Sequence, residues 1–462
     1  MKFTYQYFSQ DISGFLTNQP SNKNLLEEKF LPQNFSKLKD IISHIDNILS
    51  HKPNTTSIID ENVAKKLYAL LTLPTQQDDI LDFEKITNKL LKQNISEVII
   101  LGTGGSSLGS QALYEMASQI SKTKPNGQAY PRLDIFINFD PIDFYNKTKH
   151  INWQKTALVA ISKSGDTLET ILQTLYILPL MEKSLGRENI KNHFWVVSEK
   201  KSSPLNNLAD NYNAQKLIHD PYLSGRYSVL SVVGMLPAAM AGLSVKNIRK
   251  GASDMLRHCL SYDLEKNPAA QSALAIFGLE EVKKKSAVVM LSYADRLSTL
   301  CRWFRQLWAE SLGKNGKGST PIFATGPVDQ HSQLELWLGG PMDKIYTILT
   351  TAEKIQLASP NEKLLALHDK LSHYQGINLE DMMDACASGI NDVFLEFHLP
   401  VRTICLSHLN EESIGALLMH FMMETLFVGF LRGGFDPFGQ PRVEDGKQKI
   451  RQQLERIRQS KL

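Results

Sequence analysis

The chain has 462 residues, of which 42% are hydrophobic and 21% are charged, a composition that indicates a globular protein of two or three domains. The formal net charge of +3 is too small to favour nucleic-acid binding. The first residues lack the basic and apolar blocks of a signal peptide, and the apolar stretch 231–245 is too short and too interrupted to span a bilayer. Four widely spaced cysteines without a Cys-x-x-Cys pair favour free thiols, so we expect a cytoplasmic protein.

Residues 1–80 are predicted to form an N-terminal helical segment, because apolar residues recur at helical spacing between Leu38 and Leu49. Short apolar runs then follow one another about a βαβ unit apart, roughly thirty residues. The two sets of runs are 98–101, 135–137, 158–161 and 194–197, then 287–291, 345–349 and 401–406. This spacing predicts an α/β fold with two parallel sheets, each covered by helices on both faces.

The two sets of strands predict two α/β domains, residues 81–243 and 244–446, followed by a C-terminal helical tail of residues 447–462. Ile450, Leu454 and Ile457 form a narrow apolar stripe on this tail, which we expect to dock onto the body of the protein. Parallel α/β sheets bind ligands at the carboxyl ends of their strands. The functional site is therefore expected in the loops that follow the strands.

A glycine-rich loop, residues 102–109, follows the first predicted strand and precedes a helix. It does not fit a dinucleotide-binding fingerprint, because Ser107 stands where the third glycine is required and no acidic residue closes a following strand. A purely structural turn is one interpretation of this loop. A second loop with hydroxyl groups is expected to end a neighbouring strand, and this favours a role for Ser106 in binding an anion.

That second loop, residues 162–170, follows a buried strand and is the most informative segment of the chain. It turns at Gly165 and carries four side-chain hydroxyls, on Ser162, Ser164, Thr167 and Thr170. Hydroxyls, backbone N–H groups and the start of a helix together suit a phosphate dianion. Neither a Walker lysine nor a cluster of metal-binding carboxylates accompanies the loop, so the phosphate is expected to be held and not transferred.

Two further segments contain candidate catalytic groups. Gln306 and Glu310 lie four residues apart on a predicted helix with an aromatic face, so their side chains share one side of it. A carboxylate beside an amide suits a general base, although most such pairs on helices are solvated surface. Arg226 lies in a glycine turn before an apolar helix. Its permanent charge suits an anion or an enediolate, although a surface or capping arginine is the commoner case.

Three other features are ambiguous when each is considered alone. Residues 313–320 resemble a Walker loop, but a serine and not a lysine follows Gly318, and a helix and not a strand precedes the segment, so an NTP site is rejected. His331 has no metal-binding partners at ligand spacing. Lys447 by itself is consistent with a solvated charge.

Six segments in the same order resemble the glucose-6-phosphate isomerase family in its bacterial form, and they are residues 102–106, 162–170, 223–228, 306–314, 330–331 and 438–447. Each proposed catalytic side chain is retained, whereas Ser224, Gly439, Arg442 and Asp445 differ from the residues that are usual in the family. The resemblance extends from about Val98 to Lys447. It implies two parallel-sheet sugar-isomerase (SIS) domains, each an αβα sandwich.

The resemblance also implies a function, the reversible aldose–ketose isomerisation of glucose 6-phosphate and fructose 6-phosphate in glycolysis and gluconeogenesis, without metal or organic cofactor. His331 and Lys447 would move protons during ring opening, with Glu169 as a candidate charge partner of His331. Glu310 would then transfer a proton between C2 and C1 through a cis-enediolate that Arg226 stabilises. The residues implied to bind substrate are Gly105, Ser106, Ser162, Lys163, Ser164, Thr167, Gln306 and Gln440. A homodimer is implied, with His331 contributed across the interface, and neither nucleic acid nor membrane is expected as a partner.

Two alternative functions stay open at this point. The hydroxyl loop is common to other sugar-isomerase domains, so the substrate could instead be a phosphate of mannose or of an amino sugar. Arg226, His331 and the segment from Gln440 to Lys447 favour glucose 6-phosphate. A non-catalytic sugar-phosphate sensor would need only the hydroxyl loops, whereas this chain also retains Glu310 and the other catalytic candidates.

Overall fold

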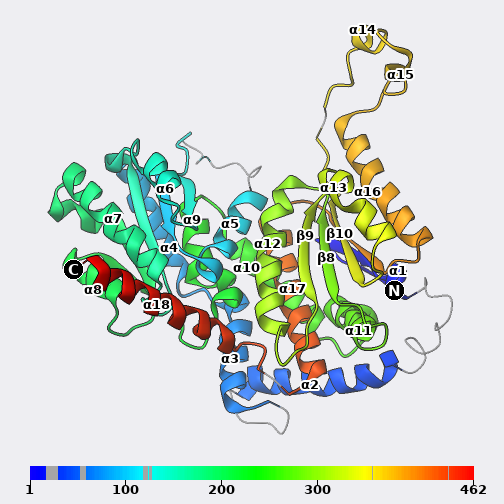
Figure 1. The fold of residues 1–462 in the computed structure, drawn as a ribbon, viewed down its shortest axis with the longest axis horizontal. Helices are drawn as coiled ribbons and strands as arrows, with labels where there is room; N and C mark the ends of the chain where they lie inside the picture. The colour runs from blue at the N-terminus through cyan, green and yellow to red at the C-terminus, as the bar shows by residue number, and fades with distance from the viewer. Residues whose placement is uncertain are drawn as a thin grey trace.

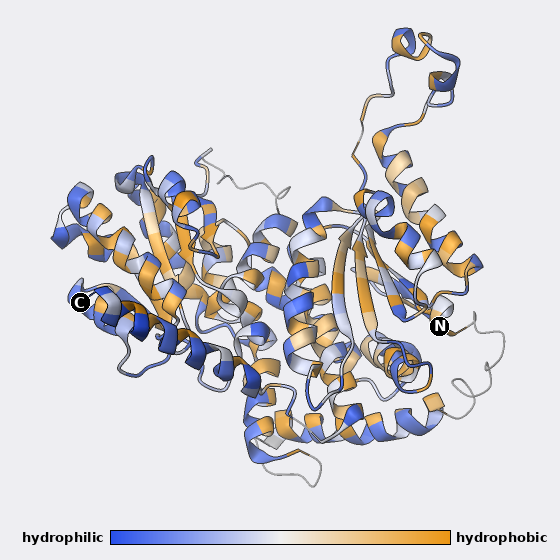
Figure 2. Ribbon diagram, in the orientation of Figure 1, coloured by the Kyte–Doolittle hydropathy of each residue, from blue (hydrophilic) through white to orange (hydrophobic). Residues whose placement is uncertain are grey.

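A computed structural model describes residues 1–16, 30–51, 59–117, 123, 127–355, 357–434 and 436–461. The described chain forms two α/β units that lie next to each other, each built around one sheet (Figure 1). Hydropathy colouring shows that the strands are mainly hydrophobic, whereas the helices around them carry both kinds of residue (Figure 2). This is the pattern expected for sheets whose two faces are both covered by helices.

The first sheet is entirely parallel, with the strand order β4-β3-β5-β6-β7. Its strands are β3 (Glu97–Leu101), β4 (Arg132–Phe136), β5 (Thr156–Ile161), β6 (Phe194–Ser198) and β7 (Gln215–Ile218). The four predicted strands are confirmed. Apolar periodicity did not indicate β7, because this edge strand is short and largely exposed.

Helices cover both faces of this sheet. Along β3, Val98 and Ile100 belong to one hydrophobic cluster, whereas Ile99 and Leu101 belong to another, as the alternation of side chains along a strand requires. The helices of this unit are α4 (Ile80–Lys92), α5 (Leu108–Met116), α6 (Pro141–Thr148), α7 (Leu168–Leu185), α8 (Pro204–Asn211) and α9 (Val232–Met240).

The second sheet is mixed, with the strand order β1-β2-β11-β10-β8-β9. Its parallel strands are β8 (Ala287–Ser292), β9 (Thr320–Thr325), β10 (Lys344–Thr351) and β11 (Val401–Leu406). Three of these four were predicted. The edge strand β9 was not, because most of it is only half-buried and it therefore lacks a continuous apolar run.

The start of the chain corrects the prediction of a wholly helical N-terminal segment. β1 (Lys2–Thr4) and β2 (Phe8–Asp11) form an antiparallel hairpin, and β2 pairs antiparallel with β11. The side chain of Gln10 is buried and donates a hydrogen bond to the carbonyl of Pro268 (2.9 Å). Strands of three and four residues carry little local signal. β1 pairs with β2, and the other partner of β2 lies nearly four hundred residues away in β11, so tertiary pairing determines the structure of this hairpin.

The rest of the predicted N-terminal segment is helical where it is described, whereas residues 17–29 and 52–58 lie outside the described part of the chain. α1 (Ser13–Leu16) is followed by α2 (Leu31–His51) and α3 (Glu61–Leu71). The predicted apolar face of α2 is confirmed, because Leu38, Ile41 and Ile45 are fully buried.

The helices of the second unit are α10 (Val245–Cys259), α11 (Pro268–Glu281), α12 (Ser298–Leu312), α13 (Val328–Gly339), α16 (Leu379–Glu396) and α17 (Glu411–Arg432). α10 and α17 pack backbone to backbone, since a Cβ on Gly251 or Gly415 would lie 1.8 Å from a carbonyl oxygen of the other helix. α17 is long and apolar enough to cross a membrane, but 94% of its most apolar stretch is buried, as in the core helix of a globular protein.

Two segments carry helices that have no buried residue. The first is an arm, described over residues 352–355 and 357–378, that projects from the body and carries α14 (Glu362–Leu365) and α15 (Asp369–Ser372) (Figure 1). The second is the C-terminal helix α18 (Pro441–Lys461), which starts earlier than predicted and has no buried residue. The expected docking of its stripe is not found among the described residues, because Ile450, Leu454 and Ile457 are 50%, 40% and 49% exposed.

Candidate active site

The first glycine loop is pressed against two other segments. It forms the turn η3 (Gly104–Ser106) at the carboxyl end of β3. Gly104 has a left-handed backbone (φ 59°), and a Cβ there would lie 2.9 Å from the amide nitrogen of Gln306. A Cβ on Gly105 would lie 2.3 Å from the carbonyl carbon of Gly225. Only glycine permits this approach, which places the loop beside α12 and beside the turn that bears Arg226.

The second loop is organised by its own hydroxyls. The Ser162 side chain is buried, and its Oγ accepts hydrogen bonds from the backbone N–H groups of Gly165 (3.1 Å) and Thr167 (3.4 Å). The hydroxyls of Ser162 and Thr167 are 2.7 Å apart. Ser164 Oγ accepts from the backbone N–H of Asp166 (3.1 Å). This loop leaves the carboxyl end of β5 and leads directly into α7.

The two loops lie next to each other, as predicted. β3 and β5 are parallel neighbours, with Leu101 opposite Ala160, so both loops leave the same edge of the sheet. Lys163 connects the second loop to the segment before Arg226, because its Nζ donates to the carbonyl of Pro221 (2.7 Å). Burial lowers the pKa of Lys163, and the nearby carboxylates of Glu199 and Asp220 oppose this shift.

Arg226 is at the centre of the constellation. It lies in the turn η6 (Gly225–Leu230), and its side chain is completely buried. The five N–H bonds of its guanidinium all point at protein acceptors. These are Ser311 Oγ (2.8 Å), Glu310 Oε2 (3.2 Å), Gln440 Oε1 (2.8 Å) and the carbonyls of Pro437 (2.7 Å) and Gly439 (3.0 Å). One arginine thus joins the first unit, the end of α12 and the chain before α18.

Glu310 lies in the last turn of α12, and both of its carboxylate oxygens are oriented. Oε1 accepts from the amide nitrogen of Gln306 (2.9 Å), and Oε2 accepts from Arg226. The predicted Gln306–Glu310 pair is therefore real and is not solvated surface. The Glu310 side chain is 28% exposed, and it borders a cavity of about 780 Å³ whose other side includes Gly439, Gln440 and Arg442.

Three predicted site residues lie outside this constellation. α12 returns from the carboxyl end of β8 to the start of the parallel strand β9, and His331 follows the far end of β9. Glu310 and His331 of one chain are thus separated by about the 20 Å length of a six-residue strand. Lys447 is exposed on α18 and pairs with Glu444 (2.7 Å). Within the described residues no hydrogen bond or ion pair joins His331 to Glu169.

Several contact residues of the site were not among the predicted functional residues. Ser311 accepts from Arg226 and lies 3.0 Å from the hydroxyl of Tyr227, whose pKa burial raises to about 12. Their positions beside Glu310 and Arg226 were the only available signal. No sequence signal could have indicated the carbonyls of Pro437 and Gly439, because a backbone acceptor does not depend on residue type. In the described parts of the chain, no three His, Cys, Asp or Glu side chains form a group that could hold a metal ion.

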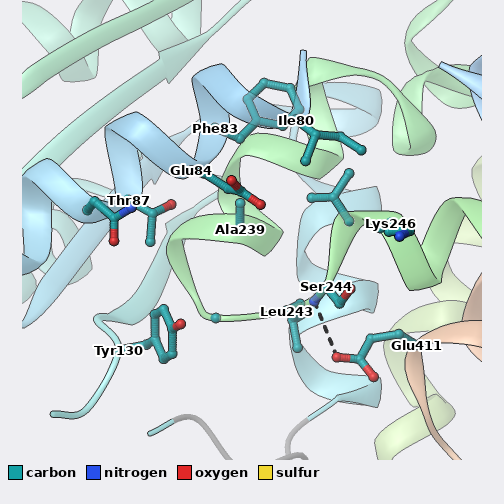
Figure 3. Close-up of a pocket in the computed structure, with 13 residues that line it drawn as sticks. Ile80, Phe83, Glu84, Thr87, Tyr130, Ala239, Leu243, Ser244, Lys246 and Glu411 are labelled. Carbon is teal, nitrogen blue, oxygen red and sulfur yellow. Dashed lines mark hydrogen bonds between the residues drawn. The ribbon is translucent and has the colours of Figure 1, made fainter. Parts of the chain in front are cut away.

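A separate cavity of about 480 Å³ lies between α4, α9 and the start of α10 (Figure 3). Phe83, Tyr130 and Leu243 line it, and Glu411 accepts a hydrogen bond from the backbone N–H of Ser244 (3.3 Å) at its edge. None of the predicted site residues borders this cavity. The Glu310 carboxylate, oriented by Gln306 and Arg226, therefore places the candidate active site at the cavity that Glu310 borders.

Comparison with known proteins agrees with this geometry. The sequence profile of the family described as Phosphoglucose isomerase matches residues 86–331. A "Probable glucose-6-phosphate isomerase" of Methanococcus maripaludis is 34% identical over 355 residues, which are 77% of this chain and 78% of the relative. The "Glucose-6-phosphate isomerase" of Rubrobacter xylanophilus is 32% identical over 380 residues, 82% of this chain and 87% of the relative.

Solved structures share the fold. A hypothetical protein from Thermus thermophilus superposes with a TM-score of 0.77 at 27% identity, covering 92% of this chain and 97% of the other. A glucose-6-phosphate isomerase from Chlamydia trachomatis gives a TM-score of 0.75 at 17% identity, over 99% of this chain and 90% of that protein. The second likeness bears on the fold alone. The predicted pair of α/β units with helical ends is thus confirmed.

Proposed function

The chain belongs to the phosphoglucose isomerase family, and we propose that it interconverts glucose 6-phosphate and fructose 6-phosphate with Glu310 as the base. The observation that carries this proposal is the orientation of the Glu310 carboxylate, held by Gln306 and Arg226 at the edge of a cavity. A sensor has no need of such a carboxylate. The reaction belongs to glycolysis and gluconeogenesis, and the free cysteines of the described chain are in keeping with a cytoplasmic enzyme.

The phosphate of the substrate is assigned to the edge of the first sheet. The loops of Gly105–Ser106 and Ser162–Thr167 leave this edge next to each other and present hydroxyls and backbone N–H groups. Lys163 adds positive charge on the same side. Binding energy from this remote group can then be used to hold C1 and C2 of the sugar against Glu310.

The proton transfer is assigned to Glu310. Its carboxylate removes the C2 proton of the open-chain aldose and returns it to C1, while the hydroxyl proton moves between O1 and O2 through the cis-enediolate. Such a positioned base contributes about 10²–10⁴ in rate. Arg226 has no N–H group left for the substrate in this arrangement, so its buried charge stabilises the enediolate through space.

Two glutamines are assigned to the sugar hydroxyls. The Oε1 atom of Gln306 is buried and has no hydrogen-bond partner among the described residues, although its amide nitrogen is bound to Glu310. A buried acceptor without a donor is costly, and a sugar hydroxyl would satisfy it. Gln440 lines the cavity that Glu310 borders, and its Oε1 accepts a hydrogen bond from Arg226 (2.8 Å). These side chains therefore orient the substrate beside the base.

Ring opening is assigned to His331 and Lys447, in a site shared by two copies of the chain. Within one chain His331 lies at the far end of the second sheet from Glu310, so it can reach the base only if a second copy supplies it. The projecting arm supports a homodimer, because exposed apolar side chains such as Leu364, Leu367 and Tyr374 need a covering surface. Glu169 is the proposed charge partner of the incoming His331.

The reaction is tested by incubating the purified protein with fructose 6-phosphate in EDTA and measuring glucose 6-phosphate. We expect turnover in the wild type without added metal, and loss of nearly all turnover in Glu310→Gln, with fructose 6-phosphate binding close to that of the wild type. A wild type that binds sugar phosphates without converting them would contradict the proposal in favour of a sensor. Conversion of mannose 6-phosphate alone would indicate another sugar isomerase.

A further inference from the structure

The C-terminal end of α12 lies directly beside Glu310, and its final carbonyl groups have no partner within the helix. Each of the last four is nevertheless satisfied. The carbonyl of Ala309 accepts from the backbone N–H of Gly313 (2.9 Å), and that of Leu312 accepts from the guanidinium of Arg432 (3.2 Å). The carbonyls of Glu310 and Ser311 both accept a hydrogen bond from Nζ of Lys314, each at 2.6 Å.

A tight hairpin holds the backbone of Lys314 in place for these contacts. The backbone groups of Lys314 and Lys317 bond to each other in both directions, at 2.9 and 3.2 Å. Between them, Asn315 (φ 53°) and Gly316 (φ 72°) are both left-handed, as a type I′ turn requires, and Asn-Gly is its preferred sequence. The segment that superficially resembles a Walker loop is thus a turn that folds one lysine back onto the preceding helix.

We infer that Lys314 is a positioning residue for the proposed base: its ammonium group holds the backbone of the helical turn that carries Glu310. The inference rests on the proposed function and deepens it. Two bonds from a charged donor fix that turn, and a cation at this place also offsets the negative end of the helix dipole. A displacement of the turn by about 1 Å would move the carboxylate away from C1 and C2 and lower the rate about 10²-fold.

The surroundings of Lys314 make this support depend on pH. Burial, and after it the positive charge of Arg226, lower the pKa of Lys314 to about 8, against the opposing effects of Asp436 and Glu310. Asp436 is itself paired with Lys66 (2.6 Å). Lys317 and Arg442 are the other charged groups at the same cavity.

The sign of the pH effect follows from this shift. Lys314 is an ammonium below about pH 8 and loses its proton as the pH rises through that value. The neutral amine binds the two carbonyls more weakly and no longer opposes the helix dipole. The support of Glu310, and with it kcat, is therefore expected to decline on the alkaline side.

The test compares Lys314→Met, Lys314→Arg and the control Lys92→Met, which removes an equal charge from an exposed lysine in the last turn of α4, away from the cavity that Glu310 borders. For Lys314→Met we expect kcat to fall about 10- to 100-fold with a KM for fructose 6-phosphate within about threefold of the wild type, because positioning and not binding is lost. Lys314→Arg should keep most of the activity and lose the alkaline decline near pH 8, since arginine stays charged. Lys92→Met should behave as the wild type.

Thermal unfolding of each variant identifies any that fail to fold, and in that case the pH profile of Lys314→Arg decides. The inference is overturned if kcat of folded Lys314→Met stays within about twofold of the wild type, or if Lys92→Met is equally impaired. An alkaline decline unchanged in Lys314→Arg would overturn it as well. An active wild type with an unimpaired Lys314→Met contradicts this inference alone, whereas an inactive wild type contradicts the proposed function too.

Discussion

Ser162 shows that a hydroxyl in a phosphate loop can act on the loop itself. Its oxygen is buried and receives two backbone N–H groups of the same turn, at Gly165 and Thr167. The neighbouring Ser164 is half-exposed and accepts a single hydrogen bond. Both serines lie in the loop that the sequence predicts to bind one anion. The two serines differ in the structure, because the buried oxygen of Ser162 holds the backbone of the loop in its conformation.

Replacement of Ser162 by alanine should therefore raise KM more than replacement of Ser164. Loss of three hydrogen bonds, two from backbone N–H groups and one to the Thr167 hydroxyl, loosens the whole loop. Each bond is worth about 0.5–1.5 kcal/mol, so the KM for fructose 6-phosphate is expected to rise about tenfold, with kcat changed much less. Steady-state kinetics of both variants measure this, with the exposed Ser202→Ala as control. An unaltered KM in Ser162→Ala would show that the loop does not hold the phosphate.

At this scale the sequence predicted side chains better than it predicted their partners. Gln306 and Glu310 could be paired because a helix brings residues four apart together. Arg226 could be named as a charge near a turn, but not as the residue that joins three segments. Two of its acceptors are backbone carbonyls from a part of the chain more than two hundred residues later.

Among the elements, the strand-to-loop junctions were the most predictable. β3 and β5 are apolar runs that end in glycine and hydroxyl residues, and the carboxyl-end rule for parallel sheets then places both loops together. The short or half-exposed strands β1, β2, β7 and β9 were missed, because their register comes from neighbours in the sheet. Because β9 was not predicted, the sequence also did not show that Glu310 on α12 and His331 on α13 lie near opposite ends of this strand.

The close contact between η3 and η6 requires a glycine at position 105, and a substitution there tests this. In Gly105→Ala the added Cβ would meet the carbonyl carbon of Gly225 at 2.3 Å, so the two turns must separate and Arg226 must shift. We expect kcat to fall at least about tenfold, since the base is oriented by Arg226. The control is Gly389→Ala, at a helical glycine with open space around it. Equal kcat values for the two variants would contradict the proposed role of this contact.

For the whole molecule, composition and βαβ spacing were enough to predict two α/β units. They did not predict the segments that lie outside the repeated strands and helices. The N-terminal hairpin completes the sheet of the second unit, and the arm and α18 leave apolar side chains exposed. Such surfaces are settled by contacts between distant segments or between chains, for which one sequence carries no periodic signal. The domain limits at residues 80, 243 and 446 and the proposed dimer therefore remain predictions.

The shared site can be tested by complementation. Glu310→Gln and His331→Ala should each be inactive, and mixed subunits of the two variants should regain activity, because one site of the mixed dimer combines intact Glu310 and intact His331. Random reassortment predicts about one quarter of the wild-type activity. Activity of the dissociated and reassembled mixture is the measurement. If both residues act within one chain, no activity returns.

The most direct test of the account follows the proton that Glu310 is proposed to move. Fructose 6-phosphate is incubated with enzyme in D2O, and NMR measures deuterium at C1 of fructose 6-phosphate and at C2 of glucose 6-phosphate. We predict deuterium incorporation with the wild type and almost none with Glu310→Gln, although calorimetry should show that the variant still binds fructose 6-phosphate. Exchange at the wild-type rate in Glu310→Gln would contradict the assignment of Glu310 as the base.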